Sequence, residues 1–296
     1  MPGRKVRKSA GKRHKFRLGR LHWSALPGGG HYPFGLRAAK AEVLLLVGRW
    51  TELEQMYRQD CDRARAAGMR GVQARLLMHH GELLGWRRHD KRARVLLEEA
   101  AAIFRELGDD RGLLQCRNGQ AVTCIALGEY ERAEALVTES EGSARRRGYR
   151  QILCWLLNSH AVLCRERGQI ERAIAYIEER MTISQELGGL TEVASSHMNL
   201  AVMFSEDGRH DLALEQNRAA LELGHRMGDA VLQNYALYNQ AQIFRKMGRG
   251  VECLDCLRQA LAISRHLGDE PMERDIQKDM SNVEKAMRKN KKIEDL

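Results

Sequence analysis

The sequence has few of the residues that favour β-structure and few that break helices. Of its 296 residues only 5% are aromatic and four are prolines, whereas alanine, leucine, glutamate and arginine are abundant. Those four residues lose little freedom on entering a helix, so the composition predicts a helical protein. No run of eighteen apolar residues occurs, so we expect no membrane-spanning helix. The basic N-terminus lacks a following apolar segment and does not resemble a secretory signal.

The sequence also lacks the usual signatures of disulfide, metal and catalytic chemistry. Its seven cysteines are odd in number and irregularly spaced, which disfavours a disulfide framework and fits a reducing cytoplasm. Cys253 and Cys256 have zinc-like spacing, but no second pair completes four ligands, so we interpret them as packing residues. The neighbouring His79 and His80 would point to different faces of a helix. We therefore expect no metal, no cofactor and, without a nucleophile elbow or phosphate loop, no enzyme activity.

The positive charge of the chain is concentrated in its first twenty residues. The net charge is +10, and this segment carries nine basic residues and no acid, which leaves the rest nearly neutral. They are Arg4, Lys5, Arg7, Lys8, Lys12, Arg13, Lys15, Arg17 and Arg20. Residues 1–35 also contain glycine and proline without apolar periodicity, so we expect a disordered basic tail. The tail could bind nucleic acid, an acidic protein or an anionic surface, or could be a solubilising arm or chain upstream of the true start.

Glycines recur at intervals of forty residues. One series is Gly68, Gly108, Gly148, Gly188, Gly228 and Gly268, and a second is Gly48, Gly128, Gly168, Gly208 and Gly248. In the second series Arg88 takes the place of a glycine. A glycine after an apolar-periodic run is typical of a helix C-terminus. Two turns per unit leave room for two helices of roughly fifteen residues, the hairpin unit of a helical solenoid.

Small and bulky residues follow the same period. One small-residue column is Ala41, Gly81, Ala121, Ala161, Ala201 and Ala241, and a second is Leu53, Ala93, Ala133, Ala173, Ala213 and Cys253. Leu44, Leu84, Cys124, Cys164, Phe204 and Phe244 form a bulky column between them. Small side chains are required where two helices cross closely, and bulky ones fill the space between helices. The columns therefore predict paired helices stacked in register.

The pattern resembles the tetratricopeptide repeat family. The spacing of Ala161, Gly168 and Ala173 matches the family, and Met-Asn-Leu-Ala at 198–201 is similar to its Asn-Leu-Gly signature. The forty-residue length and the Leu-Gly-Asp turns at 107–109 and 267–269 resemble the longer-repeat subgroup of Pins-type adaptors and bacterial signalling regulators. The consensus aromatics and the consensus proline are largely absent. Arg117, Leu157, His197 and Leu237 stand where the family has Trp.

The resemblance implies an all-α, right-handed α-α superhelix. We expect about six helix pairs over residues 36–270, a capping helix over 271–290 and a charged tail end at 291–296. The capping helix would carry an apolar stripe that includes Met272, Ile276 and Val283.

The resemblance also implies that the first helix of each pair lines a concave groove. The predicted groove residues are Asn118, Val122, Ile125, Trp155, Asn158, Val162, Arg165, Met198, Asn199, Val202, Tyr235, Tyr238, Asn239, Gln242 and Arg245. Amides can pair with a peptide backbone, and tyrosines are good anchors. Alternatively, Asn199 and Asn239 could brace neighbouring helices, and the valines could be covered by adjacent units. The carboxylate clamp that some family members use lacks its lysines here.

Three functional hypotheses follow. The first is a cytoplasmic, non-catalytic adaptor that binds a peptide or helix of another protein in the groove. The second is a nucleic-acid-associated regulator whose basic tail holds DNA or RNA while the stack recruits a protein. The third is a sensor of a small molecule or signal peptide that uses the same groove.

Overall fold

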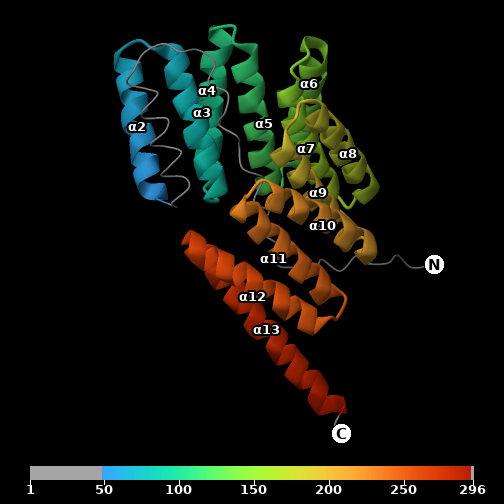
Figure 1. Cartoon of the computed structure of the whole chain (residues 1–296). Coiled ribbons are helices and arrows are strands. Elements are labelled where there is room, and N and C mark those ends of the chain that lie inside the picture. The colour runs from blue at the N-terminus through green and yellow to red at the C-terminus, as the bar shows by residue number, and fades with distance from the viewer. Residues whose placement is uncertain (1–48, 295–296) are drawn as a thin grey trace, which may run out of the picture.

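The computed structural model describes residues 49–294, with side chains as far as Arg288, and this part forms a stack of helices (Figure 1). The helices are α2 (Trp50–Ala66), α3 (Arg70–Trp86), α4 (Asp90–Glu106), α5 (Asp110–Leu127), α6 (Tyr130–Arg147), α7 (Arg150–Glu166), α8 (Ile170–Glu186), α9 (Leu190–Glu206), α10 (His210–Arg226), α11 (Ala230–Lys246), α12 (Gly250–Leu267) and α13 (Glu270–Glu294). The basic tail at 1–35 and the first helix of the first pair lie outside the described residues.

Helices α2 to α12 end at the positions of the two glycine series. Every glycine of the two series from Gly68 onward has a positive φ, and Arg88 adopts the same left-handed conformation with φ of 64°. In the turn after α4, the backbone N–H of Asp109 donates to the carbonyl of Phe104 at 2.9 Å, which satisfies a carbonyl that the helix leaves unpaired. A side chain other than glycine is strained in this conformation, so Arg88 fills its place at a cost.

The small-residue columns lie at close contacts between helices. Ala121, Ala161 and Ala201 are completely buried, and a Cβ added at Gly81 would approach Leu97 to 2.8 Å. Each helix packs on the next along the chain, and α3 also contacts α5, α5 contacts α7, and α9 contacts α11. The predicted all-α superhelix of helix pairs is therefore confirmed over the described residues.

The last helix is longer than the predicted capping segment. It runs from Glu270 to Glu294, so it includes Pro271 in its first turn and takes in residues 291–294, which the sequence assigned to a separate tail end. Proline fits a first turn. Met272, Ile276 and Val283 are buried in the same apolar cluster as residues of α11 and α12.

The described interior is mainly apolar, and it encloses the thiols. All seven cysteines are free and buried. Burial raises the pKa of the Cys256 thiol to about 11, so at neutral pH this thiol is protonated. The described residues contain no cluster of three His, Cys, Asp or Glu side chains that could hold a metal ion. None of the described helices combines the length and apolar character needed to cross a membrane.

Candidate functional site

The odd-numbered helices form the inner layer of the stack. Helix α3 approaches α5, α5 approaches α7 and α9 approaches α11, whereas no two even-numbered helices of the described stack approach as closely. In a curved two-layer stack, the layer whose members lie closer together is on the inside of the curve. We call the surface of α5, α7, α9 and α11 that points into this curve the inner face. All fifteen predicted groove residues lie on these four helices, and all are half-buried.

An apolar row runs along the inner face. Val122 on α5, Val162 on α7 and Val202 on α9 are each half-buried, as are their neighbours Ile125 and Trp155. The valines are thus neither fully covered by adjacent units nor fully exposed. Covering the remaining apolar surface with a partner would be favourable by about 25 cal/mol per Å² removed from water.

A series of hydrogen bonds joins successive odd-numbered helices, and we call it the inner-face ladder. It consists of Ser159 Oγ to Asn118 Oδ1 at 2.8 Å, Asn199 Nδ2 to Asn158 Oδ1 at 2.9 Å, and Tyr238 Oη to Asp279 Oδ2 at 2.7 Å. Each of these bonds links a residue to the one forty-one positions later. Asn199 therefore braces α9 against α7, which is the alternative role that the sequence left open for this residue.

Between α9 and α11 the ladder has no side-chain pair, and the hydrogen bond there runs from Lys246 Nζ to the backbone carbonyl of Ser205 at 3.0 Å. The pair at the equivalent positions is Met198 and Asn239, and a thioether cannot replace the amide that Asn158 offers one unit earlier. Asn239 makes no hydrogen bond with any side chain or backbone group of the described residues. Its carbonyl and its NH₂ are therefore both available. In Asn118, Asn158 and Asn199, by contrast, one half of the amide is already used.

The polar end of the inner face is organised by Asp279 of α13. Its carboxylate accepts hydrogen bonds from Tyr238, from Gln242 Nε2 at 2.8 Å and from Arg245 Nη1 at 3.4 Å. Burial, together with this carboxylate, raises the pKa of the Tyr238 hydroxyl, so it stays protonated and donates. Asp279 was not among the predicted residues. The signal that could have found it is its position forty-one residues after Tyr238.

Arg165 also connects neighbouring units. Its guanidinium pairs with Glu166 at 2.9 Å and lies 3.9 Å from the carboxylate of Glu206 on α9. The arrangement offers apolar contact and amide hydrogen bonding, and it has no group poised to act as an activated nucleophile.

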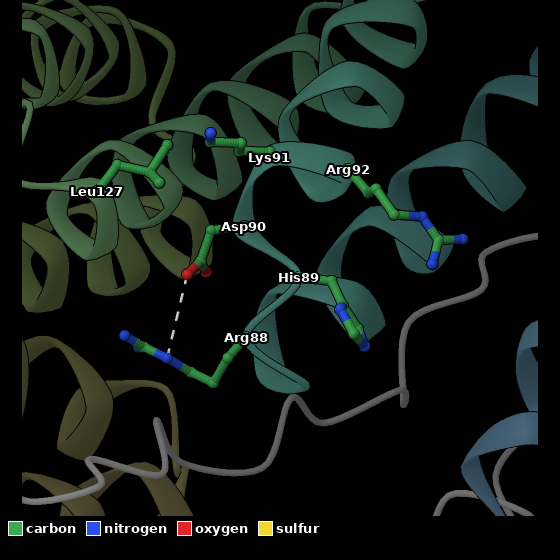
Figure 2. Close-up of a pocket in the computed structure, with 6 residues that line it drawn as sticks. All are labelled: Arg88, His89, Asp90, Lys91, Arg92 and Leu127. Atoms are coloured by element: carbon green, nitrogen blue, oxygen red, sulfur yellow. Dashed lines mark ion pairs between the residues drawn. The ribbon is translucent and has the colours of Figure 1, made fainter.

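The turn between α3 and α4 forms an open depression of about 370 Å³ (Figure 2). Arg88 lies 4.0 Å from Asp90, Arg92 pairs with Glu54 at 2.8 Å, and Lys91 lies in the same lining as Leu127. Figure 2 shows that the basic side chains spread away from one another. Because they do not converge on one point, they do not form a binding site for a single anion.

Two segments match models of a known family. Residues 151–224 and residues 236–271 each match a model described as tetratricopeptide repeat. Among curated proteins, no sequence matches this chain.

Several solved structures share the fold. A Rap conjugation gene regulator of plasmid pLS20 in complex with the Phr* peptide is 12% identical, with a TM-score of 0.66 over 86% of this chain and 73% of that one. A Rap protein complexed with Competence and Sporulation Factor is 11% identical, with a TM-score of 0.63 over 84% and 74%. BtubC from P. vanneervenii is 19% identical, with a TM-score of 0.58 over 75% and 92%. At these identities the likeness concerns the fold alone.

Proposed function

This chain is a tetratricopeptide repeat protein, and we propose that it is a non-catalytic adaptor that binds an extended segment of another protein along its inner face. The segment lies across α5, α7, α9 and α11. Its side chains cover the valine row, and its backbone pairs with Asn239 between α9 and α11. Buried, protonated thiols fit a cytoplasmic protein of this kind.

The observation that carries the proposal is that the inner-face ladder has no side-chain hydrogen bond between Met198 of α9 and Asn239 of α11. An amide with both halves free can donate to a backbone carbonyl and accept from a backbone N–H of the same strand-like segment. Asn239 is such an amide, and it is half-buried in the inner face. A bound helix would satisfy its own backbone groups internally and would leave Asn239 without a partner. Of the two occupants that the sequence left open, the extended peptide is therefore favoured.

The surroundings of this step suit the side chains of a peptide. Met198 and Val202 lie on α9, and Tyr235 lies on α11 beside the amide, all half-buried. Methionine adapts its shape to an irregular partner, and tyrosine contributes a large contact area with few rotatable bonds. The two Rap structures, whose folds are similar, hold a peptide and a competence and sporulation factor respectively.

A peptide-display selection against the whole chain tests the proposal. We expect enrichment of peptides whose binding is lost, by about a hundredfold or more, when Val162 and Val202 are both replaced by Glu, because a buried unpaired carboxylate opposes binding. The double variant should keep its helicity and melting temperature, since both valines are only half-buried. Replacing Val95, an exposed valine on α4, by Glu is the matched control and should leave binding unchanged.

Two outcomes would contradict the proposal. One is the absence of enriched peptides, and the other is enriched peptides that bind the double variant as well as the parent chain. A chain without residues 1–20 should bind the same peptides equally well. If binding instead followed the tail and weakened steeply with salt, the basic segment and not the inner face would be the binding site.

A further inference from the structure

Arg180 is a buried cation at a position that the repeat otherwise fills without a cation. The residues at intervals of forty from it are Asp60, Ala100, Ser140, Ala220 and Ala260. Arg180 is 6% exposed, on the face of α8 that packs against α9. A guanidinium in place of a methyl group must be accommodated within the joint between these two helices, which we call the α8–α9 joint.

The guanidinium is poorly compensated. Its Nη1 donates to Ser196 Oγ at 2.8 Å, but its Nε is buried without a hydrogen-bond partner, and Arg180 forms no ion pair with a carboxylate of the described residues. The nearby Cys154 makes only long contacts, 3.6 Å to Ser184 Oγ and 3.9 Å to the carbonyl of Arg180. The carboxylate of Glu192 acts on this cation only from beyond ion-pair distance, so the cost of burying the charge is partly offset and still opposes the packing of this joint.

The turn that closes the same joint makes the same backbone hydrogen bonds as the other turns but is richer in glycine. Gly188 and Gly189 are the only consecutive glycines among the turns that connect the described helices. Gly189 occupies the N-cap position of α9 and has no side chain with which to cap it, whereas Asp109 and Asp229 cap α5 and α11. Glycine has more conformational freedom to lose on folding than any other residue. Two independent features of the sequence thus weaken one end of the α8–α9 joint.

The other end of the joint is apolar and firm. Ile174 and Ile177 of α8 belong to the same buried cluster as Leu200 and Met203 of α9. The joint therefore holds its buried cation toward the turn and its apolar cluster away from the turn. A joint of this kind opens from the weak end while the packed end remains closed.

We propose that the α8–α9 joint is the hinge of this superhelix, at which the turn end of α9 separates from α8 and so changes the width of the inner face between α7 and α9. The opening moves Ser196, which bonds Arg180, together with Met198 and Asn199 on the inner side of the same helix. The hinge is a property of the free chain and does not depend on what the inner face binds.

Hydrogen exchange of the full chain tests this hinge. Amides of residues 190–199 should exchange about tenfold or more faster than those of the equivalent segment 230–239 in α11. Replacing Arg180 by Met, which fills similar space without charge, should slow exchange at 190–199 by about tenfold or more. Replacing Gly189 by Ser should slow it by a smaller factor, because serine at an N-cap accepts a hydrogen bond from the first turn. The Glu192 carboxylate lies 2.7 Å from the position of a Cβ at Gly189, and as the end of a flexible side chain it moves aside.

The control is Arg172→Met, which removes an exposed arginine from the same helix and should leave the exchange at 190–199 unchanged. Equal exchange in the two segments of the parent chain would overturn the proposal. So would faster exchange, or loss of folding, in Arg180→Met, since either result would make Arg180 a tie that holds the joint together.

Discussion

The contacts of α9 with the helices before it differ from its contacts with the helices after it. The hydrogen bonding on the inner face and the packing in the interior change in opposite directions between these two sides. Toward α7 and α8, the inner-face ladder is complete at Asn158 and Asn199, but the joint holds Arg180 and an uncapped Gly-Gly turn. Toward α10 and α11 the ladder is open at Asn239, but the joint holds no buried cation. There the carboxylate of Asp229 caps α11 at 3.0 Å.

This difference assigns movement to the side of α9 that faces α7 and α8, and binding to the side that faces α10 and α11. We call these the moving side and the binding side. A surface amide left free on well-held helices stays in a fixed position, which reduces the entropy lost when a partner binds. A weak joint next to it permits α9 to shift without disturbing that position. The same repeat thus supplies both properties through single residues, Arg180 in place of alanine and Met198 in place of asparagine.

Introducing a buried arginine between α10 and α11 should have the largest effect on the free energy of unfolding. Replacing Ala220 by Arg places a guanidinium forty residues beyond Arg180, at a site that is completely buried. We expect a loss of about 3 kcal/mol or more in the free energy of unfolding, from overpacking and from an unpaired buried charge. Urea denaturation measures it. A loss below about 1 kcal/mol would mean that the two joints tolerate charge equally well.

Removing the cap on the binding side should have an intermediate effect. Asp229→Ala takes away the oxygen that accepts from the N–H groups of Val231 and Leu232. We expect a loss of about 1 kcal/mol in the free energy of unfolding and faster exchange of amides in the first turn of α11. Unchanged exchange there would show that the α10–α11 turn does not depend on this cap.

The two ladder asparagines should respond differently to the same substitution. Asn199→Ala removes the bond to Asn158 and should cost about 1 kcal/mol in the free energy of unfolding. Asn239→Ala removes a side chain without a partner and should change that free energy by less than about 0.5 kcal/mol. Thermal denaturation of both variants compares them. Equal losses would show that Asn239 already supports the fold.

The repeating columns of the sequence predict the fold because the need for a small residue at a helix crossing, or for glycine at a helix end, depends only on the local backbone. They place the fifteen groove residues on the inner helices for the same reason. They cannot distinguish Asn199 from Asn239, since both occupy the consensus position and only the partner forty-one residues earlier differs. Nor do they show what surrounds Arg180, although its departure from the alanine column is readable. The length of α13 was missed because no residue after Asn290 stops the helix.

The most direct test of the binding side is Met198→Asn. This substitution supplies the missing amide opposite Asn239, in the arrangement that Asn158 and Asn199 already have. We predict that it raises the free energy of unfolding by about 1 kcal/mol and weakens the binding of selected peptides by about tenfold or more, because Asn239 is then engaged. The measurement is a binding titration of one selected peptide against the parent chain and this variant. Unchanged affinity in a variant that is stabilised would contradict the assignment of Asn239 to the peptide backbone.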